Sequence, residues 1–183
     1  MSRGVTEYET KKYERMWKFK DYRQHSPGTG IAPQAFKALN LHSGDSIIDY
    51  GCGEGHTVRY FRDKGLFSRG IDLVSLFPAA IIGSLWELPE DLEGSDYAFS
   101  ADVMEHIPTD LVYPSLHNIA RLTAKEAFFQ IAIGGESHGK LIGKKLHLTI
   151  KPVGWWNVEL LKHFSQIKLG GDDHYRFTAH CKK

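Results

Sequence analysis

The sequence has few cysteines, little net charge and no long hydrophobic run, and each absence excludes a class of protein. Its two cysteines, Cys52 and Cys181, lie far apart and lack the CxxC spacing of zinc and redox sites, which favours reduced thiols. A formal net charge of +1 argues against a dedicated nucleic-acid coat. The N-terminal segment is too polar for a signal peptide, and no stretch has the length and apolarity of a membrane span. We therefore expect a cytoplasmic protein with no membrane partner.

What is present fits one globular domain. The chain has 183 residues, 42% of them hydrophobic and 25% charged, which is enough for a genuine core but too little for a second large domain. Charge is unevenly spread, because Lys and Arg outnumber Asp and Glu in residues 1–23 and again in residues 134–151. An anionic substrate and a plain solvated surface both account for these basic stretches.

Short apolar strands alternate with helices in the middle of the chain, a pattern typical of a parallel sheet. The N-terminal segment shows helical spacing up to Trp17, residues 26–30 resemble a loop, and a second helix is expected over 33–41. Two final strands predict an antiparallel hairpin that turns at residues 170–173. The predicted strands cover residues 46–50, 67–72, 79–82, 96–101, 125–133, 164–169 and 174–181, with helices near 57–64, 112–120 and 153–163.

Three glycines follow the first of these strands in the run IIDYGCGEGHT, residues 47–57. At Gly51, Gly53 and Gly55 the backbone is expected to turn sharply and to let a ligand approach so closely that a Cβ would clash. The first N–H groups of the following helix then face an anionic part of the ligand. Nicotinamide-binding loops have the pattern GxGxxG, and His56 occupies the third glycine position here, so the spacing does not suit a diphosphate.

A GxGxG loop preceded by an acid resembles motif one of class I S-adenosylmethionine-dependent methyltransferases, with Asp49 as the acid two positions before Gly51. The resemblance implies that Asp49 serves the methionine amino group, directly or through water. Asp72, at the end of the second predicted strand, would accept hydrogen bonds from both ribose hydroxyls. Nicotinamide-dependent enzymes share this acid, and an aspartate can also simply end a strand.

The run SDYAFSADVMEHIP, residues 95–108, resembles the fourth motif of the same family, in the branch with Asp-Val-Leu-Glu-His-Ile-Pro after strand four. Met104 replaces the leucine of that pattern. The segment leaves the carboxyl end of a central strand, so Asp102 and His106 are expected to border the reactive methyl group. In GSLWELP, residues 83–89, Ser84 replaces the usual acid near the adenine, while Leu85 and Trp86 are candidates for adenine contact or for plain packing.

The resemblance implies a Rossmann-like α/β fold: a mostly parallel seven-stranded sheet with a C-terminal antiparallel hairpin and helices on both faces. We expect one domain over 1–183, with a helical cap or lid at 1–43, a cofactor-binding core at 44–133 and an acceptor-side region with the hairpin at 134–183. The short link between the second and third strands leaves one sheet face to be covered, and we expect the N-terminal helix to cover it. The implied contacts to S-adenosylmethionine are Asp49, Tyr50, Gly51, Cys52, Gly53, Gly55, Asp72, Leu73, Ser84, Leu85, Trp86 and Asp102. Tyr22 and Arg23 are added as contacts of an N-terminal lid, although a helix packed on the sheet would need the same apolar stripe.

Methyl transfer from a sulfonium is a displacement with a neutral leaving group, so the enzyme chiefly positions the acceptor and removes a proton. We expect His106, Asp102 and His147 to be the catalytic residues, with His106 as base for a hydroxyl or ring nitrogen. A histidine that only hydrogen-bonds locally is the alternative for His106, and His138 is a further candidate on the acceptor side. A metal site formed by His106, His138 and His147 with Asp102 is conceivable, but we expect no metal, because the chain lacks HxxxH and HxH spacings.

The acceptor is less clearly indicated than the cofactor. The sequence has neither the Asn/Asp-Pro-Pro-aromatic tetrad nor the Pro-Cys nucleophile of DNA methyltransferases, so sequence-specific DNA binding is not expected. O- or N-methylation of a small-molecule or carbohydrate-like acceptor is the more economical interpretation. The alternatives are binding of the cofactor without methyl transfer, a nucleic-acid or nucleotide methyltransferase, and a nicotinamide-dependent enzyme.

Overall fold

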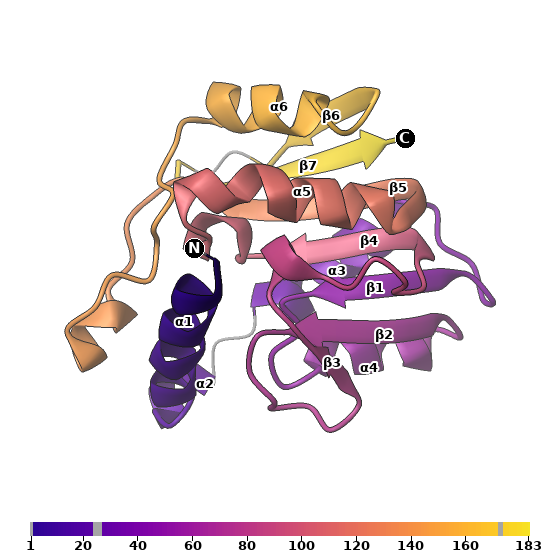
Figure 1. The fold of residues 1–183 in the computed structure, drawn as a ribbon. Coiled ribbons are helices and arrows are strands. Elements are labelled where there is room, and N and C mark those ends of the chain that lie inside the picture. Colours follow the sequence, from indigo (N-terminus) through magenta and orange to yellow (C-terminus); the bar gives the residue numbers. More distant parts are fainter. Residues whose placement is uncertain (1, 24–26, 172–173) are drawn as a thin grey trace.

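The computed structural model describes residues 2–23, 27–171 and 174–183, and these residues form a seven-stranded sheet in the order β3-β2-β1-β4-β5-β7-β6. β1 to β5 are parallel, and β7 runs antiparallel to both β5 and β6. This arrangement confirms the predicted Rossmann-like fold with its antiparallel end (Figure 1). The strands are β1 (Ser46–Tyr50), β2 (Phe67–Asp72), β3 (Ala80–Ile82), β4 (Ser95–Ala101), β5 (Thr123–Ala132), β6 (Gln166–Gly170) and β7 (Arg176–Lys182).

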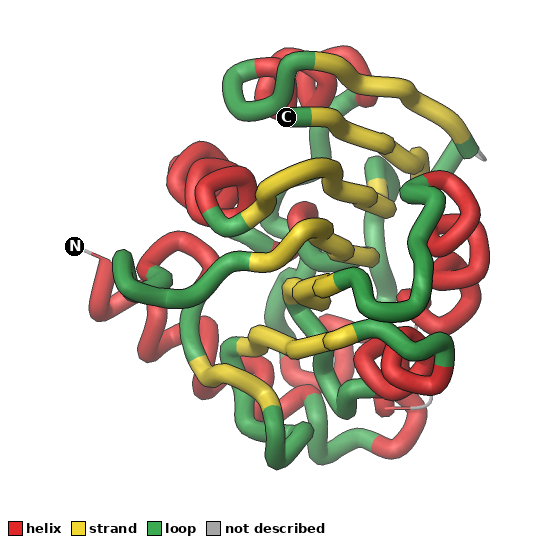
Figure 2. The backbone as a smooth tube through the Cα atoms, turned by 90° about the vertical axis from the view of Figure 1, so that its right-hand side faces the viewer, coloured by secondary structure: helices red, strands yellow, loops and turns green. Residues whose placement is uncertain are grey.

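Helices cover both faces of the sheet, as Figure 2 shows. α3 (Pro27–Ala38) and α4 (His56–Asp63) pack on one face, and α5 (Val112–Arg121) and α6 (Val153–Leu161) on the other. Each helix presents an apolar side to the strands: α4, for example, buries Val58 and Phe61 and leaves Arg59 exposed. Within the described ranges, none of the helices has the length and apolarity needed to cross a lipid bilayer.

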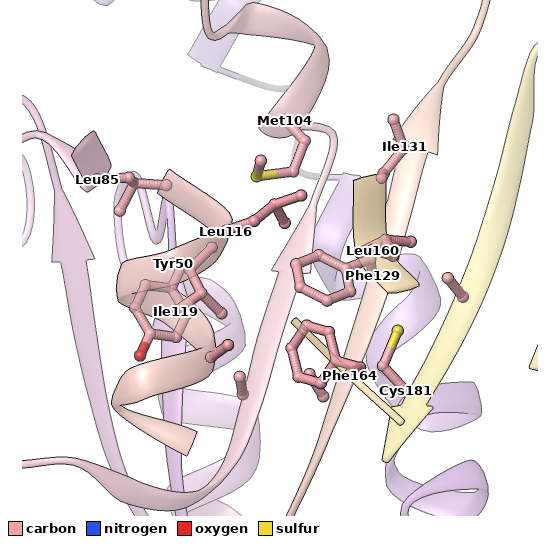
Figure 3. Close-up of a cluster of buried hydrophobic side chains, with 14 of the residues drawn as sticks. Tyr50, Leu85, Met104, Leu116, Ile119, Phe129, Ile131, Leu160, Phe164 and Cys181 are labelled. Atoms are coloured by element: carbon pink, nitrogen blue, oxygen red, sulfur yellow. The ribbon is translucent and has the colours of Figure 1, made fainter. Parts of the chain in front are cut away.

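The larger core lies between the sheet and the pair α5 and α6 (Figure 3). Tyr50 of β1 and Phe129 of β5 meet Leu116 of α5 and Leu160 of α6, and all four side chains are fully buried. Burial of one such side chain contributes roughly 1.5–3 kcal/mol. This packing holds the ends of the central strands, and therefore the loops that leave them, in a fixed arrangement.

The N-terminal helix does not lie where the sequence analysis expected it. α1 (Ser2–Met16) and α2 (Lys20–Arg23) stand beside the carboxyl ends of the parallel strands and cover neither face of the sheet (Figure 1). Met16 packs instead against Ile142 and Leu146. The face near β2 and β3 is covered by the segment after β3 itself, whose Leu85 and Leu88 join the larger core.

The predicted loop at 26–30 is also wrong for its described residues, because α3 begins at Pro27. Proline suits a first helical position, since its missing N–H has no partner there in any case. Gly28 allows this helix to approach α4 closely: a Cβ at Gly28 would lie 2.7 Å from Thr57 Oγ1. Ser26 and, in the predicted hairpin turn, Asp172 and Asp173 lie outside the described residues.

Candidate functional site

A cavity of about 760 Å³ opens at the carboxyl ends of the parallel strands. The strand order reverses between β1 and β4, which is where open α/β sheets bind their ligands. Loops after β1 to β5 and the N-terminal helices line this cavity. The lining includes most residues that the sequence analysis selected, namely Tyr22, Arg23, Asp49, Gly51, Cys52, Gly53, Asp72, Leu73, Ser84, Leu85, Trp86, Asp102, His106, His138 and His147.

Two residues of the predicted contact set do not line the cavity. The Tyr50 side chain is fully buried in the larger core, on the far side of its strand from the ligand space. Gly55 has φ +73° and precedes α4, and a Cβ there would lie 2.6 Å from Phe77 Cγ. Both residues flank the glycine loop in the chain and support its conformation without facing the cavity.

Backbone geometry makes the loop a cradle for a closely approaching ligand. Gly51 has φ +82°, and a Cβ at this position would lie 2.3 Å from Val103 Cγ2. Gly53 has φ +51°, and the ring of Trp17 lies 3.0 Å from where its Cβ would be. The loop is tied to β2, because the Gly51 N–H donates to the Ile71 carbonyl over 2.8 Å. A side chain at either glycine would therefore collide with Val103 or Trp17, in a backbone conformation that favours glycine.

Two buried carboxyl groups flank this loop. Asp49 is only 3% exposed, and burial, reinforced by the charge of Asp72, raises its pKa to about 8. Asp72 accepts hydrogen bonds from the backbone N–H groups of Gly53 and Val74 over 2.7 and 3.0 Å, yet burial still raises its pKa. Burial thus outweighs the hydrogen bonds and charges among the described residues that would lower either pKa. The pair therefore favours a ligand that brings positive charge and hydroxyl donors.

Asp102 follows β4 in a conformation that is uncommon for a non-glycine residue, with φ +52°. Its carboxylate accepts hydrogen bonds from Gln130 Nε2 and Arg176 Nε, each over 2.9 Å. Burial raises the pKa of Asp102, while the nearby Arg176 guanidinium and the Gln130 amide oppose that rise. Strained backbone of this kind gathers at functional sites.

Two histidines meet at the other end of the cavity. The rings of His106 and His147 lie 4.7 Å apart between centroids, at an interplanar angle of 88°. His106 Nδ1 lies 2.8 Å from the Tyr13 hydroxyl and 3.1 Å from the Leu146 carbonyl oxygen. Burial, with a further contribution from His147, lowers the pKa of His106 to about 3. His106 is therefore neutral at physiological pH.

Glu105, beside His106, is a buried acid to which the sequence analysis gave no role. Its side chain is fully buried, and within the described residues neither carboxylate oxygen has a hydrogen-bond partner of good geometry. Its Oε1 lies 3.9 Å from Nε2 of His147. Burial and the charge of Asp102 raise the pKa of Glu105. An acid between the apolar residues Met104 and Ile107, both of which are buried, is the feature of the sequence that could have indicated a buried acid here.

The N-terminal helices close one side of the cavity. The rings of Trp17 and Tyr22 meet edge to face, with 5.0 Å between their centroids. Arg23 forms an ion pair with Glu54 of the glycine loop, and the Arg23 Nε–H donates to Glu54 Oε1 over 2.9 Å. Glu9 and Glu136 also line the cavity and were missed, because nothing in the local sequence links either of them to the glycine loop.

The strand order and the position of the cavity are those of the Rossmann-like methyltransferase fold, and solved structures with this fold superpose on 76–100% of the chain. Scans with protein-family models and against curated proteins find no match to the sequence. The likeness is thus one of structure.

Three methyltransferase structures illustrate it. A TehB-like S-adenosylmethionine-dependent methyltransferase from Corynebacterium glutamicum has 20% identity and a TM-score of 0.65, over 96% of this chain and 99% of that one. Magnesium protoporphyrin IX methyltransferase from Synechocystis, with bound S-adenosylhomocysteine, has 14% identity and a TM-score of 0.68 over 100% of both chains. The 1,6-didemethyltoxoflavin-N1-methyltransferase of Burkholderia thailandensis has 15% identity and a TM-score of 0.69, over 96% and 88%. At these identities the comparison shows the fold.

Proposed function

We propose that this protein binds S-adenosylmethionine in the cavity and transfers its methyl group to an oxygen or nitrogen of a small-molecule acceptor. The observation that carries this proposal is the glycine loop flanked by the buried carboxyl groups of Asp49 and Asp72. Support comes from the shared fold, since two of the three similar methyltransferases were crystallised with S-adenosylhomocysteine. Residence in the cytoplasm is part of the same proposal.

The residues present fit such a cofactor in charge and shape. Asp49 would bind the cationic amino group, and Asp72 the ribose hydroxyls, because both carboxyl groups line the cavity and burial raises the pKa of each. Gly51 and Gly53 have the positive φ that shapes the loop, and both line the cavity. The other proposed contacts are Cys52, Leu73, Asp102, Tyr22 and Arg23, with Ser84, Leu85 and Trp86 toward the adenine.

When bound, the sulfonium supplies an electrophilic methyl group, which passes to a lone pair of the acceptor while the C–S bond breaks and its electron pair stays on sulfur. His106, Asp102 and His147 are our proposed catalytic residues, at the end of the cavity left for the acceptor. With a pKa near 3, His106 is neutral and holds a proton only weakly. It would therefore orient the acceptor, and the proton that a hydroxyl or amino acceptor loses would pass to solvent water.

The test is calorimetry of the full chain with S-adenosylmethionine, S-adenosylhomocysteine and NAD. We expect both sulfur compounds to bind one per chain and NAD not to bind. Tight NAD binding without a response to the sulfur compounds would replace the proposal with a nicotinamide-dependent enzyme. Where the sulfur compounds bind, incubation with labelled S-adenosylmethionine and pools of hydroxylated and amino compounds separates methyl transfer from binding alone.

A further inference from the structure

Three potential metal ligands converge at the acceptor end of the cavity. Among the described residues, one carboxylate oxygen of Glu105 and one ring nitrogen each of His106 and His147 all lie within 4.8 Å of one another. The sequence analysis expected no metal because it considered spacing along the chain. The fold brings His147 to Glu105 and His106 from a separate segment about forty residues away.

We propose that Glu105, His106 and His147 bind a divalent transition-metal ion. Two imidazoles and one carboxylate suit Zn²⁺, Mn²⁺, Fe²⁺ and Co²⁺. The site rests on the proposed function and deepens it. An ion with three protein ligands would keep open positions for a hydroxyl or carboxylate oxygen of the acceptor, and two of the three ligands, His106 and His147, line the cavity.

The hydrogen bonds of both imidazoles leave a lone pair for such an ion. His147 Nδ1 lies 2.7 Å from the Gly134 carbonyl oxygen, and His106 Nδ1 lies 3.1 Å from that of Leu146. A carbonyl oxygen only accepts, so His147 Nδ1 carries the proton and its Nε2 has a free lone pair. His106 Nδ1 also lies 2.8 Å from the Tyr13 hydroxyl, and in the tautomer that donates to Leu146 the Nε2 of His106 is free in the same way. Metal-bound histidines usually donate their second N–H in this way, which fixes the orientation of the ring.

Glu105 would supply a carboxylate oxygen, and its backbone holds the cluster together. Among the described residues neither oxygen of its buried side chain makes a hydrogen bond of good geometry, so both are available as ligands. The backbone carbonyl of Glu105 accepts from the N–H groups of Leu148 and Thr149, over 2.8 and 2.9 Å. These bonds hold the segment that carries His147 next to Glu105.

The spacing is wider than that of a bound ion. Zinc–nitrogen bonds are about 2.0–2.1 Å long, so two ligands of a tetrahedral ion lie about 3.4 Å apart. Ligand atoms that lie up to 4.8 Å apart in the structure would therefore have to approach by as much as about 1.4 Å, through side-chain rotations.

The test uses the untagged full chain, treated with EDTA and desalted, then titrated with CoCl₂ by calorimetry and by visible absorption. We expect one ion per chain with a micromolar or tighter Kd and the absorption bands of a nitrogen- and oxygen-ligated Co²⁺. E105Q and H147N should each weaken binding at least tenfold. The control is H117N, because His117 lies on the exposed side of α5, with its ring 6.0 Å from that of His163, and represents adventitious surface binding.

Folding and cofactor binding are checked on the same samples. E105Q should melt no lower than the unsubstituted chain in EDTA, because it removes an uncompensated buried carboxyl group. The proposal is overturned if the unsubstituted chain binds no Co²⁺, if folded E105Q and H147N bind it equally well, or if H117N alone loses it. A chain that binds S-adenosylhomocysteine but not Co²⁺ rejects the metal site and leaves the proposed function standing. A chain that binds Co²⁺ but not S-adenosylhomocysteine supports the metal site and rejects the proposed function.

Discussion

The Tyr13 hydroxyl lies 2.8 Å from Nδ1 of His106 and so joins the N-terminal helix to the loop that follows β4. The two rings meet edge to face at 5.9 Å between centroids. Because these residues are far apart in the sequence, the bond fixes how α1 closes the acceptor end of the cavity. It also positions the His106 imidazole.

Removing that hydroxyl should loosen α1. We expect Tyr13→Phe to lower the free energy of unfolding by about 0.5–1.5 kcal/mol, the net value of one hydrogen bond. Urea unfolding followed by tryptophan fluorescence measures the change. Tyr113→Phe is the matched control, because Tyr113 is 53% exposed and should have little effect. Equal effects of the two substitutions would show that the Tyr13 bond adds nothing to stability.

Asp72 should dominate recognition of the ribose. We expect Asp72→Ala to weaken binding of S-adenosylhomocysteine about ten- to hundredfold, since a hydrogen bond to a charged group is worth about 1.5–3 kcal/mol. Calorimetry gives the Kd, and circular dichroism checks that Asp72→Ala is folded. Asp110→Ala, at an exposed position after β4, is the control and should bind normally. An unchanged Kd in Asp72→Ala would mean that the ribose lies elsewhere.

Cofactor affinity should depend on pH through Asp49. Its pKa of about 8 in the free protein means that it carries a proton at neutral pH, and binding a cationic amino group requires that proton to leave. The Kd for S-adenosylhomocysteine should therefore fall as pH rises from 6 to 8, by up to about tenfold per unit, and then level off. Asp49→Asn should bind more weakly and show a flatter profile. A steep profile retained in Asp49→Asn would assign the proton to another group.

Gly51 should tolerate no side chain. Its φ of +82° and the 2.3 Å approach of Val103 to a Cβ both oppose alanine. We expect Gly51→Ala to destabilise the fold by about 1–3 kcal/mol and to abolish cofactor binding. Gly4→Ala is the control, because Gly4 lies in α1 with nothing within 4 Å of its Cβ position, and alanine there should be neutral or stabilising. Thermal melting and calorimetry compare Gly51→Ala with Gly4→Ala. Similar melting temperatures for the two variants would show that the loop does not require glycine at position 51.

Local sequence patterns were sufficient for the sheet and the glycine loop. β1 and β4 are short apolar runs followed by turn residues, and the backbone at Gly51 and Gly53 adopts the positive φ that their glycines suggest. The start of α3 was missed because Pro27 and Gly28 look like loop residues until the packing of Gly28 against Thr57 is seen.

The acceptor end could not be predicted in the same way. The meeting of His147 with Glu105 depends on backbone hydrogen bonds between two segments that are distant in sequence. The place of α1 beside the cavity rests on its contacts with Leu146 and Ile142, which follow from the tertiary fold rather than from helical periodicity. Sequence patterns report local geometry, whereas this end of the site is built from non-local contacts.

A crystal structure of the chain with S-adenosylhomocysteine is the most direct test of the central claim. The account predicts the amino-acid tail of the ligand in the loop between Tyr50 and His56, its amino group at Asp49 and its ribose at Asp72. A loop without ligand at saturating concentration, or a ligand whose ribose lies away from Asp72, would contradict it.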